Sequence, residues 1–355
     1  MEARMSQTEL SPSAVRSSSQ PSSGFDSSGF ENSGKIARPM EQAEIALREF
    51  DQEAKEASIA QAMQHAATLI RFREFGSAQN LLRHALLQDS KNLRAIEMMA
   101  EVLEKVGNLE EALKCRRALV RLQPNADHHL DLAALYYTLE NDVSALATYE
   151  DALANHAMPE SRLFEVYKNI GNIQVRRGDF DAAEDYYNRA FTIEPKSDAL
   201  LVNFGTLEIN RDDLEAASAR FRAALNVNPE SDRAWVGLAL VHRSKGDFEL
   251  SWANLERSLD LNPKNRTALK LIVEWSVRDG RVQSAAYRLE NYLSADGEDA
   301  EMAFSMAKCL TLLGRFDEAL LECERVVALD PEQEEAYRLR RILAERIVAE
   351  TDARA

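Results

Sequence analysis

The chain has 355 residues, of which 45% are hydrophobic and 29% charged, and its formal net charge is -16. These values are ordinary for a soluble globular protein, whereas the acidic balance argues against a general binder of nucleic acid or of anionic membranes, because both need a basic surface. No apolar run approaches the roughly 20 residues of a membrane span, so we expect no membrane insertion.

The chain begins with a segment rich in Ser, Gly and Pro and nearly free of aliphatic side chains. Such a segment cannot bury enough apolar area to offset its ordering entropy, so residues 1–38 are predicted to be a disordered tail. Its first ten residues, MEARMSQTEL, lack an apolar signal core, and the three cysteines of the chain are scattered. Together these features indicate a reducing, cytoplasmic location, with each cysteine a packing residue.

Residues 22–34 of the tail, SSGFDSSGFENSG, contain two copies of Ser-Gly-Phe followed by an acid. The copies lie five residues apart, at Phe25-Asp26 and Phe30-Glu31. We interpret them as a candidate short linear motif that docks in a protein groove. The alternative is that the tail is a featureless solubilising extension.

Residues 39–59 form a helix-like run, and a repetitive region follows. A small residue recurs after the turn in the middle of each repeat, with successive spacings of 34, 33, 38, 34, 34, 34 and 34. These marker positions are Ala78, Ala112, Ala145, Ala183, Ala217, Ser251, Ala285 and Ala319. A fixed period of this length is typical of a solenoid built from helix pairs.

The clearest repeat reads Trp235-Val-Gly-Leu-Ala-Leu-Val-His242, then GDF at residues 246–248, and it ends at Pro263. It resembles the tetratricopeptide repeat (TPR) family, whose pattern is W-x2-L-G-x2-Y, then A-x3-F, then P. The resemblance covers residues 60–331. It implies an all-α fold, a right-handed α-solenoid of about eight helix-turn-helix units, in which each unit buries its apolar face against its neighbours.

The spacing divides the array. Units 1–3 are expected over residues 60–157 and units 4–8 over residues 158–331, followed by a C-terminal cap helix and tail over residues 332–355. The single step of 38 brings four extra residues near Pro159, which is about one helical turn. Either the first helix of unit 4 starts a turn early or a loop separates two sub-blocks, and we favour a kink at residues 156–162.

The chain contains no catalytic signature: it has no glycine-rich phosphate loop, no G-x-S-x-G, no HExxH and no CxxC. We therefore expect a non-enzymatic protein without catalytic residues, cofactor or metal. Its function should lie in a surface that binds protein or peptide partners, and nucleic acid is not expected among them.

In the TPR family the first helix of each unit lines a concave groove. The resemblance implies that the groove of units 4–7 carries six cations: Lys168, Arg176, Arg233, Arg243, Lys270 and Arg278. We interpret them as a groove for acidic or aromatic-acidic peptide segments, because convergent cations bind carboxylates together. The alternative is that they are ordinary solvated helix residues.

Two further groups of residues belong to this predicted groove. Val236 and Leu240 lie one turn apart and would supply apolar lining. Asn172 and Asn203 match two positions of the TPR domains that clamp a C-terminal carboxylate, but Gly237 stands where that pattern requires an arginine. The clamp is therefore an alternative with an incomplete match.

The resulting prediction is a scaffold or adaptor that binds partner segments in its concave TPR groove. Two alternatives remain open at this stage. The chain could be a regulatory subunit that controls a partner enzyme or GTPase, or it could be a self-associating structural protein, since a homo-oligomer is compatible with the sequence.

Overall fold

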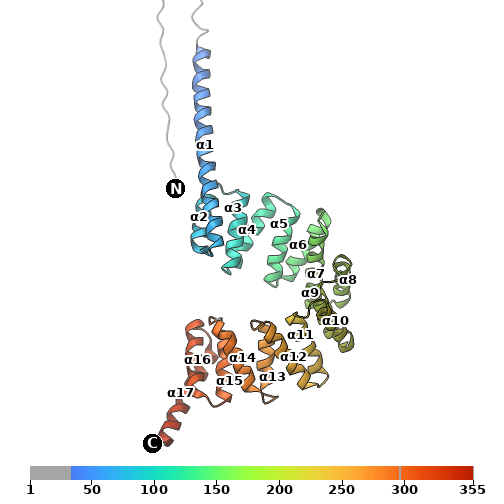
Figure 1. Ribbon diagram of the computed structural model, residues 1–355. Helices are drawn as coiled ribbons and strands as arrows, with labels where there is room; N and C mark the ends of the chain where they lie inside the picture. Colours follow the sequence, from blue (N-terminus) through green and yellow to red (C-terminus); the bar gives the residue numbers. More distant parts are fainter. Residues whose placement is uncertain (1–32, 296, 355) are drawn as a thin grey trace, which may run out of the picture. The chain divides into compact units, whose positions relative to one another are not determined.

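The protein is an α-solenoid of stacked helix pairs (Figure 1). The computed structural model describes residues 33–295 and 297–354, with side chains from residue 51 to residue 350. Within these ranges every regular element is a helix, as the sequence predicted. In chain order the helices are α1 (Ser33–Arg71), α2 (Phe75–Gln88), α3 (Leu93–Lys105), α4 (Leu109–Leu122), α5 (Ala126–Thr138), α6 (Asp142–Asn155), α7 (Glu160–Arg177), α8 (Phe180–Ile193), α9 (Asp198–Asn210), α10 (Leu214–Val227), α11 (Asp232–Ser244), α12 (Phe248–Leu261), α13 (Arg266–Ser276), α14 (Val282–Ala295), α15 (Ala300–Leu312), α16 (Phe316–Leu329) and α17 (Glu334–Arg354).

The chain divides into two compact units, residues 1–102 and residues 103–355. We describe each by itself. The first contains α1, α2 and most of α3, and the second contains the remaining helices. The sub-block boundary predicted at 157/158 lies inside the second unit.

The eight marker residues lie on the second helix of each pair. All eight have no exposed surface, and seven of them are alanines. A small side chain lets the second helix pack directly on the first, so the period read from the sequence is the period of the helix pairs. The largest fully buried side chains, such as Tyr187 and Phe221, fill the space between successive pairs.

All eight turns within the pairs contain a residue with positive φ, five positions before the marker. Glycine occupies five of these turns. The other three hold Arg73, Glu140 and Asp212, with φ between 54° and 62°. Glycine adopts this conformation without steric cost, whereas Arg73 and Glu140 adopt it because the packed helices on both sides impose it.

Side-chain caps fix where the helices begin. Asn108, Asn141, Asp179 and Asp213 each accept a hydrogen bond from the backbone N–H three residues later, at the starts of α4, α6, α8 and α10. Such a cap satisfies one of the N–H groups that a helix leaves unpaired at its first turn.

The four extra residues of the 38-residue step lie in a helix. Helix α7 begins 23 residues before its marker Ala183, whereas α9 begins 19 residues before Ala217. The connection from α6 to α7 has four residues, as does the connection from α8 to α9. The first helix of unit 4 therefore starts one turn early, and no additional loop separates the sub-blocks, whereas the kink favoured at residues 156–162 stays a prediction.

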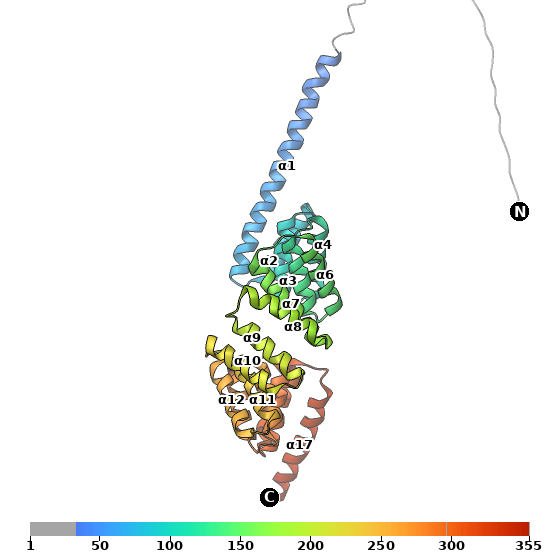
Figure 2. The same ribbon diagram turned by 90° about the vertical axis from the view of Figure 1, so that its right-hand side faces the viewer.

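Helix α1 differs from the predicted boundaries. It begins at Ser33, within the expected tail, and runs without a break to Arg71, so the leading helix and the first helix of unit 1 are one element. The sequence contains no glycine or proline between Met40 and Arg71 that would end the helix. Figure 2 shows α1 extending well beyond α2. The motif at Phe25-Asp26 and Phe30-Glu31 lies outside the described residues.

The C-terminal helix α17 packs on α16. Its residues Ala336 and Leu343 are buried, while most of its other side chains are exposed. One apolar face and one polar face are what the end of a stacked array requires, because no further pair covers it.

Candidate peptide-binding face

The predicted groove residues lie on the first helices of units 4 to 7, which are α7, α9, α11 and α13, except Arg278, which lies in the turn that follows α13. Lys168, Asn172 and Arg176 are four residues apart on α7 and therefore share one stripe of that helix. Arg233 and Arg243 lie near the two ends of α11.

A hydrogen-bonded network connects these helices through their asparagines. The Asn172 Oδ1 atom accepts from the Tyr187 hydroxyl at 2.7 Å and from Asn203 Nδ2 at 2.8 Å. Asn172 Nδ2 donates to the Tyr137 hydroxyl at 3.1 Å. The Arg233 guanidinium donates to Asn203 Oδ1 at 3.4 Å. The structure thus brings Asn172, Asn203 and Arg233 together, although they are about 30 residues apart in sequence.

Arg176 is held within the fold. Its guanidinium donates two hydrogen bonds to the carboxylate of Asp142 and lies 4.4 Å from the centroid of the Tyr137 ring. The hydrogen bonding to Asp142 raises the pKa of the Arg176 side chain. Asp142 is the first residue of α6, one repeat earlier, so this pair joins units 3 and 4.

Arg243 has a similar internal partner. Its Nη1 atom lies 3.0 Å and 2.7 Å from the two carboxylate oxygens of Asp279. The guanidinium is also 4.7 Å from the ring centroids of both Phe248 and Trp275. Arginine combines bidentate pairing with stacking, which suits it to joining successive repeats.

The two lysines are paired as well. Lys168 Nζ lies 2.7 Å from a carboxylate oxygen of Glu165 and 5.1 Å from the centroid of the Phe164 ring. Lys270 Nζ lies 2.8 Å from Glu301, and this hydrogen bond lowers the pKa of the Glu301 carboxyl. Four of the six predicted groove cations therefore already neutralise internal carboxylates, which the sequence interpretation did not anticipate.

Arg233 and Arg278 are the two exposed cations of the set that form no ion pair in the part of the chain that the structure describes. Arg278 borders a cavity of about 540 Å³ at the turns of units 6 and 7. The lining is three arginines, two acids and one aromatic residue: Arg243, Arg278, Arg281, Glu249, Asp279 and Phe248.

Arg281 and Phe248 were missed by the sequence reasoning. Arg281 pairs with Glu249 at 2.5 Å and lies 5.2 Å from the centroid of a Trp252 ring, and Phe248 is 54% exposed. Arg281 directly follows the turn glycine Gly280, and Phe248 follows another turn glycine, Gly246, after one residue. Their positions next to a turn could have identified them as site residues, because the turns bring the ends of neighbouring helix pairs together.

The predicted apolar lining is largely part of the core. Val236 is only 5% exposed, and Leu240 is half-buried against the same cluster. A Cβ atom at Gly237 would lie 2.2 Å from the Phe221 ring, so this position has no room for the arginine of a carboxylate clamp. The carboxylate clamp therefore lacks its arginine because the Phe221 ring occupies the space that a side chain at position 237 would need.

No group of three or more His, Cys, Asp or Glu side chains is arranged to hold a metal ion among the described residues. The three cysteines are unpaired thiols. A search of the described helices for a segment long and apolar enough to cross a membrane finds none.

Comparisons with known proteins identify the same repeats. Three family profiles described as tetratricopeptide repeat match residues 97–159, 164–197, 202–270 and 276–343. A human protein named Tetratricopeptide repeat protein 6 is 26% identical over 129 residues, which is 36% of this chain and 24% of that protein. The chain thus matches about a quarter of the length of this curated relative.

Two solved structures show the fold. Yeast Tom70 covers 79% of this chain and 60% of its own, with a TM-score of 0.60 and 17% identity. PilW, described as a widely conserved type IV pilus biogenesis factor, covers 60% of this chain and 98% of its own, with a TM-score of 0.51 and 17% identity. At these identities the likeness concerns the arrangement of helices.

Proposed function

The chain belongs to the tetratricopeptide repeat family, and from this premise we propose that it is a non-enzymatic scaffold that binds acidic segments of partner proteins on the first helices of units 4 to 7. The family and its fold neighbours support a role in protein–protein interaction. The choice of face and of acidic ligands rests on the geometry of the cations.

The observation that carries the proposal is the position of Arg233 and Arg278, the two cations of the set that form no ion pair within the residues that the structure describes. Arg233 donates to Asn203 of the asparagine network, and Arg278 lines the cavity together with Arg243 and Arg281. An incoming carboxylate can pair with Arg233 or Arg278 without displacing an internal acid. At Arg243 it would have to compete with Asp279. We therefore assign the first contacts to Arg233 and Arg278.

The asparagine network adds groups that recognise a peptide backbone. Each side-chain amide has two N–H donors, and Asn172 and Asn203 each use one of them within the network. The half-buried Asn172 therefore keeps one N–H for a carbonyl group of an extended segment, whereas Asn203 is only 8% exposed and acts by holding Asn172 and Arg233 in place. Backbone recognition by asparagine together with carboxylate recognition by arginine favours a short acidic peptide.

The small number of ion pairs that this face can form limits the affinity for an acidic peptide. Single exposed pairs contribute about 0–1 kcal/mol, so the few polar contacts of this face support weak binding, with a Kd of roughly 1 mM from these contacts alone. Such binding should weaken as salt rises, since the contacts are exposed.

A peptide array tests the proposal directly. The full chain, fluorescently labelled, would be applied to nine-residue peptides that are matched in length and differ in their number of acidic, basic and aromatic residues. We expect binding to rise with acid content. The variant Arg233→Glu/Arg278→Glu should lose this preference, and Arg83→Glu, which makes one such substitution at an exposed site on α2, should retain it. A preference that the double variant retains would contradict the proposed face.

The tail motif is a candidate ligand of this face. Phe25-Asp26 and Phe30-Glu31 combine an aromatic ring with an acid, which complements a face of arginines and exposed Phe248. A synthetic peptide of residues 22–34 belongs on the array beside a version with both phenylalanines replaced by alanine. Equal binding of the two peptides would remove the motif from the proposal.

We also propose a cytoplasmic location, because three unpaired cysteines are typical of a reducing compartment. Fractionation of cells that express the tagged chain tests this assignment.

A further inference from the structure

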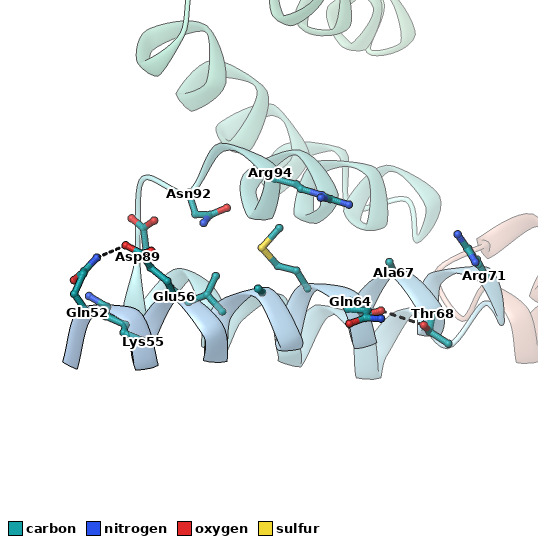
Figure 3. Close-up of a pocket in the computed structure, with 13 residues that line it drawn as sticks. Gln52, Lys55, Glu56, Gln64, Ala67, Thr68, Arg71, Asp89, Asn92 and Arg94 are labelled. Carbon is teal, nitrogen blue, oxygen red and sulfur yellow. Dashed lines mark hydrogen bonds between the residues drawn. The ribbon is translucent and has the colours of Figure 1, made fainter. Parts of the chain in front are cut away.

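The first unit contains a groove that the sequence analysis did not identify (Figure 3). It has a volume of about 800 Å³ and runs along α1, opposite the α2–α3 connection and the start of α3. Its lining includes Ile59 and Met63, which are buried against α2 and α3, and the small residues Ala60 and Ala67.

The charges of the groove are separated along its length. Glu56 and Asp89 lie at one end, together with Lys55, whereas Arg71 and Arg94 lie toward the other end (Figure 3). None of these five side chains forms an ion pair within the residues that the structure describes. The Glu56 carboxylate accepts a hydrogen bond from Gln52 at 2.7 Å. Because Glu56 is exposed, a cation can still reach it.

The same helix is uncovered beyond its neighbour. Helix α1 has 39 residues and α2 has 14, which correspond to lengths of about 58 Å and 21 Å. All residues from Asp51 to Ser58 are exposed. A second helix can therefore lie along this part of α1 without displacing any described element of the first unit.

We propose that this groove is the interface of a homodimer, in which the α1 helices of two copies pair antiparallel. The axis would pass between Met63 and Gln64, because the midpoint of positions 56 and 71 is 63.5. It places Glu56 opposite the partner's Arg71, and Arg71 opposite the partner's Glu56, as an isologous contact requires. The same axis places Ala60 opposite the partner's Ala67, where small side chains let two helices approach closely.

The charge pattern favours a second copy over an unrelated partner. Antiparallel pairing brings the acidic end of one groove to the basic end of the other, twice in each dimer. Lys55 opposes this pattern at the acidic end, but Glu56 and Asp89 still leave that end with a net negative charge. The proposal is independent of the peptide-binding face, since its test requires no peptide.

Reciprocal charge reversal tests the dimer. The full chain and the variants Glu56→Arg, Arg71→Glu and Glu56→Arg/Arg71→Glu would be compared by sedimentation velocity from about 1 to 200 µM. We expect the wild-type chain to dimerise in this range and each single reversal to weaken the dimer at least about tenfold, because each turns two attractive pairs into two repulsive ones. The double variant should regain an affinity within about threefold of the wild type, because both pairs are restored with reversed sign.

Two controls separate pairing from folding. Arg83→Glu makes an equal charge change on the exposed face of α2 and should leave the dimer unchanged. Arg71→Lys keeps the positive charge in the last turn of α1, where a cation interacts favourably with the helix dipole, and should keep the dimer. Far-UV circular dichroism of every variant would show that α1 remains helical.

Two results would overturn the proposal. The first is a chain that stays monomeric throughout the concentration range, in which case the groove serves another protein or none. The second is a dimer whose affinity does not change in Glu56→Arg and Arg71→Glu, or does not recover in the double variant, because it must then use another surface.

Discussion

Gly171 occupies a position in α7 where an added methyl group has no room. A Cβ atom there would lie 2.3 Å from Cε1 of Tyr187, whose ring is 1% exposed and whose hydroxyl donates to Asn172 at 2.7 Å. Within a helix, alanine is normally favoured over glycine by about 1 kcal/mol. Overpacking of a filled core costs about 1–3 kcal/mol, and loss of the tyrosine hydrogen bond costs about 1 kcal/mol more. We therefore expect Gly171→Ala to lower the free energy of unfolding by about 1–3 kcal/mol, against the helix preference.

Urea unfolding followed by circular dichroism measures this change. Gly76→Ala is the matched control, because no atom lies within 4 Å of an added Cβ in that helix, and it should stabilise the protein or leave it unchanged. Repeat arrays can unfold in stages, so amide hydrogen exchange should show that the loss is centred on α7 and α8. A Gly171→Ala variant as stable as the wild type would refute the reasoning from this close approach.

Two further predictions concern a turn and the cysteines. Glu140 has a φ of 54°, which costs a residue with a side chain about 1 kcal/mol, so Glu140→Gly should raise the urea midpoint; an unchanged or lower midpoint would show that the turn is not strained. Burial raises the pKa of Cys309 and of Cys323 to about 11, which at pH 8 reduces their thiolate fraction about a hundredfold relative to an ordinary thiol. Iodoacetamide should therefore modify the partly exposed Cys115 first, as mass spectrometry of timed samples would show, and equal rates at all three would contradict the burial of the other two.

The sequence allowed the repeats to be predicted because the residues that define them act locally. A small marker residue at a 34-residue period fixes one close contact in each pair, and glycines fix five of the turns. The turns at Arg73, Glu140 and Asp212 could not be recognised from their residue types, since the surrounding helices impose their conformation.

The candidate site was harder to predict because its charges are neutralised across repeats. Arg176 pairs with an acid 34 residues earlier, and Arg243 pairs with one 36 residues later. In an array of this period, residues one repeat apart are neighbours in space, so such acids could have been found by examining each cation together with the positions one period away. The groove along α1 could not be found in this way, because it depends on how far α1 extends beyond α2.

The central claim is that partner proteins occupy the first-helix face of units 4 to 7. The most direct test places a photo-crosslinking amino acid at position 233 of the full chain, on α11, and in a second variant at position 222, an exposed residue on the second helix α10. After irradiation in a native lysate, we expect crosslinked partners from position 233, and their yield should fall when an excess of acidic peptide is added. Crosslinks at position 222 in the absence of crosslinks at position 233 would contradict the account.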